Sequence, residues 1–322
     1  MNKTIKKIMA LTTCATVGIY YFNRVINYTA TLKNLLKDNH GDYYKWKNGN
    51  VFFTVQGNGS PLLLVHDLYP ASSSAEWSKI TKKLEKNHMV YCLDLPGCGR
   101  SDKPAITYTN YYFVQLLNDF AGDIIGKKTS LIATGTSGSF AIMADAMNKE
   151  NFEKVIVINP EQLQSLPSKP NKSKQILKHL LDFPIFGTFI YNIKMHEKNI
   201  AKIFRENYYY KSSVVSTKTE DIYYESAHIG CGTGRHLLSS ICSDYTKINV
   251  SHVLPELDHL YLIQSRELPQ SMQIVDSYTH QNPKIETAYI SNSKFLPQLE
   301  IPEKLHDILN MFLEIEPTVY ED

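Results

Sequence analysis

The sequence predicts an α/β fold, in which a mostly parallel central sheet is flanked by helices and carries a helical insertion. Short continuous apolar runs, among them 61–65 and 89–95, alternate with stretches of helical length. Such runs are typical of strands that are buried on both faces of a parallel sheet. The alternation stops after Asn159-Pro160 and resumes near residue 260. We therefore expect one α/β domain that is interrupted by a cap of helices.

The expected elements follow one another in the order that such a domain requires. Alternating aromatic and polar residues at 42–55 predict a strand that ends at the turn Gly57-Asn58-Gly59. Before the insertion we expect strands at 61–65, 89–95, 130–133 and 154–158, and helices at 74–86, 111–126 and 140–147. After the insertion we expect strands at 260–264 and 285–290, a helix through residue 275 and a closing helix at 302–313. The chain then divides into an N-terminal segment (1–38), a first core part (39–160), the cap (161–250) and a second core part (251–322).

The N-terminal segment has the charge pattern of a membrane anchor. Lys3, Lys6 and Lys7 precede an uncharged stretch at 8–22, which Arg24 closes. Fifteen residues of helix reach only about 22 Å, whereas the hydrocarbon core of a bilayer is about 30 Å thick. We expect an uncleaved, somewhat short anchor that associates the chain with a membrane, with the remainder in the cytoplasm. The alternative is an amphipathic or buried helix that packs on the domain.

The composition excludes several kinds of site. The 322 residues include 34 Lys and Arg against 32 Asp and Glu, without a dense basic run, so we expect no nucleic-acid partner. The five cysteines have neither CxxC nor Cys/His spacing. This pattern predicts separate structural thiols and no metal site. The sequence indicates no organic cofactor, and it leaves the oligomeric state open.

A tight turn between a predicted strand and a predicted helix is the strongest catalytic signal. Gly135-Thr136-Ser137-Gly138-Ser139 fits the pattern of a nucleophile elbow, which needs small residues two positions before and after the nucleophile. The pattern predicts that Ser137 is the nucleophile and that the Gly138 N–H helps to bind an oxyanion. The simpler interpretation is a serine that caps the N-terminus of a helix.

Two further motifs precede this turn and carry a family resemblance. His66-Asp67-Leu68 follows the first buried strand, and the segment 94–104, DLPGCGRSDKP, follows the second. Together with the elbow they resemble the α/β-hydrolase superfamily, in the branch with a DxxGxGxS turn that includes esterases, epoxide hydrolases and C–C bond hydrolases. The resemblance covers about 51–313. It implies an oxyanion hole built from N–H groups near Leu68 and of Gly138. Residues implied in the oxyanion or binding site are His66, Asp67, Leu68, Thr136 and Gly138.

This chain departs from the family pattern at two positions. Asp67 replaces the glycine that usually follows the histidine of the oxyanion loop, and Asp tolerates unusual turn dihedrals. In KFLPQLEIPE, at 294–303, the slot of the catalytic histidine holds Phe295. Phenylalanine accepts no proton, so Ser137 lacks its general base. The family's acid position falls on Glu267, with Glu161 as a weaker alternative.

Three functions remain open from the sequence. The first is a serine esterase or acyl hydrolase that acts on a small apolar or ester-like ligand, with the cap residues His228 or His236 replacing the missing base. The second is a non-catalytic homologue that binds a small apolar ligand or a protein partner, in which Phe295 packs against Ser137. The third is a membrane-tethered scaffold that makes contacts through its cap. The sequence does not name the substrate or ligand.

Overall fold

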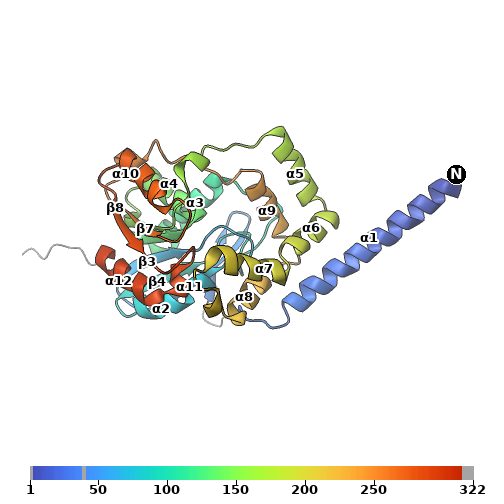
Figure 1. The fold of residues 1–322 in the computed structure, drawn as a ribbon, viewed down its shortest axis with the longest axis horizontal. Coiled ribbons are helices and arrows are strands. Elements are labelled where there is room, and N and C mark those ends of the chain that lie inside the picture. Colours follow the sequence, from blue (N-terminus) through green and yellow to red (C-terminus); the bar gives the residue numbers. More distant parts are fainter. Residues whose placement is uncertain (1–2, 38–40, 314–322) are drawn as a thin grey trace, which may run out of the picture.

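The computed structural model describes residues 3–37 and 41–313, which form one eight-stranded sheet with helices on both faces (Figure 1). The strand order is β1-β2-β4-β3-β5-β6-β7-β8, and all pairs are parallel except β1 with β2 and β2 with β4. The fold class predicted from the sequence is confirmed. The strands are β1 (Gly41–Trp46), β2 (Gly49–Gln56), β3 (Ser60–Val65), β4 (His88–Leu93), β5 (Thr129–Thr134), β6 (Phe152–Ile158), β7 (Leu260–Ser265) and β8 (Glu286–Ile290).

The first predicted strand is wrong in one respect, because 42–55 forms a hairpin. β1 and β2 pair antiparallel from Gly41 opposite Thr54 to Trp46 opposite Gly49. Lys47, in the connecting turn, has a φ of 38°, which lies in the left-handed region that short hairpin turns use. Lys47 and Asn48 are the two loop residues, because Trp46 pairs with Gly49, and asparagine is favoured in such turns.

The two faces of the sheet bury separate hydrophobic cores. One core joins the sheet to α3 (Asn110–Phe120), α4 (Thr136–Met147) and α10 (Ser271–Gln281). The other joins it to α2 (Ser78–Leu84) and α12 (Pro302–Leu313). Burial on both faces explains why the strands read as unbroken apolar runs. Because β3, β5 and β8 run parallel, their carboxyl ends lie at one edge of the sheet. Ligand sites of such folds lie at this edge.

The cap is inserted between β6 and β7 and has a small aromatic core of its own. That core contains Tyr191, Phe204 and Tyr223, and it extends onto Leu296 and Leu299 of the sheet domain. In Figure 1 the cap lies between the sheet and the long N-terminal helix. Its helices are α5 (Lys172–Asp182), α6 (Phe186–Lys194), α7 (Glu197–Ile203), α8 (Thr217–His228) and α9 (Arg235–Cys242).

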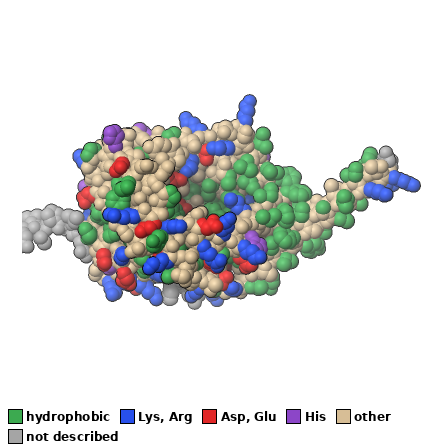
Figure 2. Space-filling view, viewed as in Figure 1, with side chains coloured by type: hydrophobic (Ala, Val, Ile, Leu, Met, Phe, Trp, Pro, Cys, Tyr) green, Lys and Arg blue, Asp and Glu red, His purple; other side chains and the backbone are tan. Residues whose placement is uncertain are grey.

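The N-terminal helix α1 (Lys3–Ala30) projects away from the domain (Figure 1). Its second half is anchored to the cap, where Asn23 donates to the Ile185 carbonyl oxygen at 2.9 Å and accepts from the Asn192 amide at 3.0 Å. Apolar side chains lie along its exposed length, as Figure 2 shows. Within the described residues, no helix combines the length and the apolar character that crossing a bilayer requires. The membrane anchor predicted at 8–22 is not supported by this finding, and the uncharged stretch of α1 contains the polar residues Thr12, Thr13 and Thr16.

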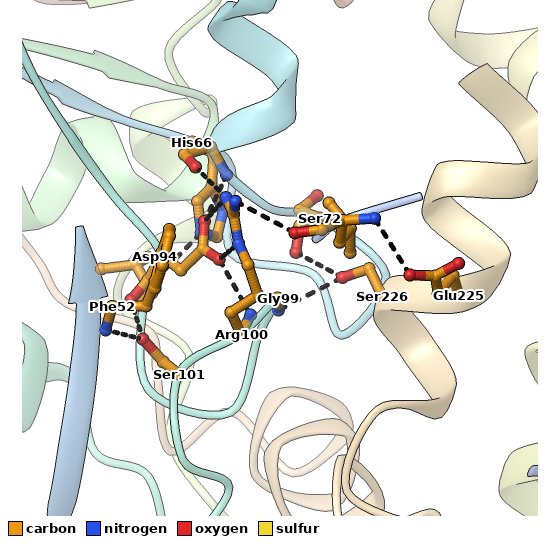
Figure 3. A network of polar contacts seen from close by, with 12 residues as sticks. Phe52, His66, Ser72, Asp94, Gly99, Arg100, Ser101, Glu225 and Ser226 are labelled. Carbon is orange, nitrogen blue, oxygen red and sulfur yellow. Dashed lines mark hydrogen bonds and ion pairs between the residues drawn. The ribbon is translucent and has the colours of Figure 1, made fainter. Parts of the chain in front are cut away.

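The segment DLPGCGRSDKP is held together by a buried ion pair and reaches the cap through a hydrogen bond. The Asp94 carboxylate, fully buried, accepts from Arg100 Nε at 2.8 Å and from the Ser74 N–H at 2.6 Å (Figure 3). Burial alone would raise the pKa of Asp94, but the Arg100 guanidinium outweighs it and lowers the pKa to about 2. The Gly99 N–H donates to Ser226 Oγ of α8 at 3.2 Å. This turn thus fixes the cap relative to the oxyanion loop.

Candidate active site

The tip of the turn between β5 and α4 is Gly135. Its φ of 59° and ψ of −128° are compatible with glycine and strained for other residues. In a nucleophile elbow the nucleophile itself occupies this sharp strand-to-helix position. Ser137 lies two residues further on, inside the first turn of α4. The sequence predicts Ser137 at the tip, whereas Gly135 occupies this position in the structure.

Within residues 3–37 and 41–313, no basic side chain is hydrogen-bonded to the Ser137 hydroxyl. The residue is fully buried, and its Oγ donates to the His66 carbonyl oxygen at 2.7 Å. The Gly138 N–H, which the sequence assigned to an oxyanion hole, closes the helix turn onto the Gly135 carbonyl oxygen at 3.0 Å. Both groups are thus engaged in local structure. A carbonyl oxygen cannot take a proton from the serine as a general base does.

The Asp67 carboxyl group lies directly over the turn. Its Oδ1 accepts from the Thr136 N–H at 2.9 Å. Burial raises the pKa of Asp67 to about 7, against the opposing effect of the Thr136 and Leu68 N–H groups. A Cβ built on Gly135 would lie 2.4 Å from Asp67 Oδ1 and 2.6 Å from Phe295 Cζ. Asp67 and Phe295 therefore fill the space that a side chain at position 135 would need.

Phe295 and the loop that carries it are held by contacts from the cap and the sheet. The phenyl ring stacks on Tyr208 with a centroid distance of 5.2 Å and an interplanar angle of 23°. Glu267, predicted as the acid, accepts from the backbone N–H of Asn292 at 2.8 Å and of Ser293 at 3.4 Å. Its carboxylate therefore stabilises the loop after β8. The alternative acid, Glu161, pairs with Lys247 (Nζ to Oε1).

His66 supports the oxyanion loop as a neutral side chain. Its Nε2 accepts from the Leu95 N–H at 3.0 Å, so Nδ1 carries the proton and donates to the Asp67 carbonyl oxygen at 2.7 Å. Burial lowers the pKa of His66, and the Asp94 carboxylate opposes this only in part. Both ring nitrogens are satisfied. His66 therefore connects the loop after β3 to the DLPGCGRSDKP turn.

The two cap histidines are engaged away from the elbow. His228 Nδ1 lies 2.7 Å from the Tyr224 carbonyl oxygen, and burial lowers its pKa to about 4. His236 Nδ1 lies 2.9 Å from Asp182 Oδ1. Among the hydrogen bonds of the described residues, none joins either histidine to Ser137. Residues 3–37 and 41–313 also contain no group of three or more His, Cys, Asp or Glu side chains arranged to hold a metal ion.

A second buried carboxyl group next to Asp67 was not anticipated from the sequence. Glu76 is fully buried and accepts from the Tyr223 hydroxyl at 2.7 Å and from the Asp67 N–H at 3.4 Å. Burial, reinforced by the charge of Asp67, raises the pKa of Glu76 to about 8. The sequence predicts Glu76 near the start of a helix at 74–86, where a carboxylate is normally exposed, so it gave no signal that this side chain is buried.

These two carboxyl groups predict a pH-dependent stability. Because their pKa values in the fold, about 7 and about 8, lie above the ordinary values of 3.8 and 4.5, the native state binds more protons than the unfolded state between these limits. Stability should therefore fall as pH rises from 5 to 7, by about 1.4 kcal/mol per pH unit for each group. Urea unfolding of the natural chain and Asp67→Asn at pH 5, 6, 7 and 8 measures this slope. We expect a shallower slope for Asp67→Asn, and parallel profiles would contradict the assignment.

Comparison with known proteins agrees with this architecture. A family model described as "Alpha/beta hydrolase family" matches residues 62–267. A 2-hydroxy-6-oxo-6-(2'-aminophenyl)hexa-2,4-dienoic acid hydrolase from Metapseudomonas resinovorans is 24% identical over 104 residues, which are 32% of this chain and 36% of that protein. The aligned part thus spans about a third of the length of the curated relatives it matches.

Two solved structures of low identity share the fold. A meta-cleavage product hydrolase from Pseudomonas fluorescens superposes with a TM-score of 0.66 at 15% identity, covering 85% of this chain and 97% of that one. A membrane phospholipase A, titled a novel bacterial virulence factor, has a TM-score of 0.63 at 16% identity and covers 98% of both chains. At such identities the likeness shows the fold alone. Because the family model covers most of the chain, the protein belongs to the alpha/beta hydrolase family.

Proposed function

We propose that this chain is a non-catalytic alpha/beta hydrolase homologue whose former active site is filled by its own side chains. The observation that carries the proposal is the Asp67 carboxyl group, which accepts the Thr136 N–H directly above Gly135. In an active elbow, the N–H of the residue after the nucleophile binds the developing oxyanion. Here the corresponding group is the N–H of Thr136, the residue after Gly135, and it already donates to the Asp67 carboxyl oxygen.

Three chemical requirements of a serine hydrolase are unmet around this turn. The tip residue Gly135 carries no nucleophile, and Phe295 accepts no proton. The third requirement is an oxyanion hole that is open and favours negative charge. The Asp67 carboxyl group fills this space, and when it is ionised it repels a developing oxyanion. Each defect supports the same conclusion independently of the other two.

The role that remains is binding without turnover, at a surface other than the elbow. The sequence left open that a small apolar ligand occupies the cleft beside Ser137. The complete burial of Ser137 and the stacking of Phe295 on Tyr208 argue against that location. Binding of a ligand or protein partner elsewhere is compatible with the filled site. The serine esterase function that the sequence left open needs a base, and the hydrogen bonds of His228 and His236 do not supply one.

An assay of ester turnover tests this proposal. We expect the purified chain and Ser137→Ala to hydrolyse p-nitrophenyl acetate and p-nitrophenyl butyrate at the same rate, equal to that of a heat-denatured control. Ser137 has no base, so its removal should change nothing. Thermal unfolding of both proteins checks that the substitution preserves the fold. Turnover that is saturable and disappears in Ser137→Ala would falsify the proposal.

A further inference from the structure

A cavity of about 470 Å³ lies between the sheet domain and the cap, next to the segment that follows α1. It is bounded by residues 35–37, by β2, by the start of α2 and by the start of α8. Pockets that bind small molecules have volumes of about 300–1,000 Å³. The lining includes neither Gly135 nor Ser137. This cavity is therefore separate from the filled elbow, and its role does not depend on the proposed function.

The lining of this cavity is basic. Five cationic side chains line it, and no Asp or Glu does so among the described residues. The overall chain is nearly balanced, with a formal net charge of +2, so the local excess is not a consequence of composition. Walls of one sign of charge focus the electrostatic potential and attract a counter-charged ligand. The cationic residues are Lys37, Lys79, Lys82, Arg100 and Lys218.

The partners of these cations show which charges remain available. Arg100 forms the buried ion pair with Asp94, and Lys79 Nζ donates to the Leu299 carbonyl oxygen at 2.6 Å. Lys37, Lys82 and Lys218 are exposed. They take part in none of the ion pairs formed by the described residues.

Neighbouring lysines in the same segments behave differently. Lys33 pairs with Asp221 at 2.6 Å, and Lys83 pairs with Glu303 at 2.5 Å. Neither of these two lysines lines the cavity. The carboxylates of this region thus neutralise the lysines beside the cavity and leave those that face it uncompensated.

The remaining lining combines hydroxyl groups with apolar surface. Hydroxyl donors are supplied by Ser74, Ser78, Ser216 and Thr219, and apolar walls by Leu36 and Ile222. Lysine ammonium groups and hydroxyls bind a tetrahedral phosphate from several directions. A carboxylate is planar and carries one charge, so it would leave more of these donors unused. The apolar walls favour a ligand that also carries a hydrocarbon group.

We propose that the cavity between α2, α8 and residues 35–37 binds a phosphate monoester that carries an apolar group. The lysines Lys37, Lys82 and Lys218 supply the charge, the hydroxyl groups orient the phosphate, and the apolar walls cover the hydrocarbon. The shared chemistry is the phosphate, whether it is the headgroup of an amphiphile or free inorganic phosphate. No bond is formed or broken in this binding.

Calorimetric titration of the full chain with octyl phosphate, below its micellar concentration, tests the proposal. We expect one molecule to bind per chain, and K37Q/K82Q/K218Q to weaken binding by roughly tenfold or more. The matched control K86Q/K127Q/K128Q removes the same charge from exposed lysines outside the cavity and should stay within about twofold of the natural chain. A parallel titration with inorganic phosphate separates the sources: weaker binding than octyl phosphate supports an amphiphile, and equal binding would show that the ligand is free phosphate and contradict the role of the apolar walls.

Two outcomes would overturn the inference. The first is the absence of saturable binding of either probe to the natural chain. The second is an equal loss of affinity in the two triple variants, because binding would then follow net charge and not the cavity. Thermal unfolding of all three proteins verifies that the exposed substitutions leave the fold intact.

Discussion

Gly135→Ser is expected to lower the free energy of unfolding by about 3 kcal/mol or more. The φ of 59° at this position is strained for a residue with a Cβ, at a cost of about 1–3 kcal/mol. The new Cβ would also lie 2.4 Å from Asp67 Oδ1 and 2.6 Å from Phe295 Cζ, and such overpacking costs about 1–3 kcal/mol. Urea unfolding at pH 7 measures the sum.

Gly122→Ser is the matched control for this substitution. A Cβ at Gly122 meets no atom within 4 Å, so its stability should stay within about 0.5–1 kcal/mol of the natural chain. The double substitution Asp67→Gly with Phe295→His removes the atoms that crowd position 135. In that background, Gly135→Ser should therefore lower the free energy of unfolding by less, and the difference should equal the overpacking cost of about 1–3 kcal/mol. Equal stability of Gly135→Ser and the natural chain would show that position 135 is not the crowded tip.

The second large effect is a gain of reactivity from three substitutions together. Asp67→Gly opens the oxyanion space, Gly135→Ser places a hydroxyl at the tip of the elbow, and Phe295→His supplies a base beside it. A general base contributes about 10²–10⁴-fold, so this triple variant should react with a fluorophosphonate at least about a hundredfold faster than the variant with Asp67→Gly and Gly135→Ser alone. Asp67→Gly with Gly135→Ser, which retains Phe295, is the control that isolates the contribution of the base. Equal rates in the triple variant and in this control would contradict the assignment of the base position.

Most of the sheet could be predicted because its signals are local. The run at 61–65 lies within β3 (Ser60–Val65), and strands buried on both faces leave an unbroken apolar run that needs no tertiary information. The helix predicted at 140–147 begins earlier, at Thr136. Its first turn consists of small and polar residues that carry no helical periodicity. The boundary of α4 was therefore set by the tight turn and not by hydrophobic pattern.

This missed boundary explains why the sequence predicted the tip of the elbow two residues too late, at Ser137 and not at Gly135. The elbow pattern requires small residues two positions on either side of the tip, and Ala133-Thr-Gly135-Thr-Ser137 satisfies it as well as the segment two residues later. The backbone dihedrals of Gly135 distinguish the two alternatives. Phe295 could be identified from flanking residues alone. The inward direction of the Asp67 carboxyl group could not, since side-chain direction in a loop depends on tertiary contacts.

Mapping the site of fluorophosphonate attachment by mass spectrometry tests the central claim most directly. The samples are the natural chain, Ser137→Ala, Phe295→His and the triple variant with Asp67→Gly, Gly135→Ser and Phe295→His. We predict an adduct only in the triple variant, on the serine introduced at position 135. An adduct on Ser137 in the natural chain or in Phe295→His would contradict the account, because Ser137 would then be a working nucleophile.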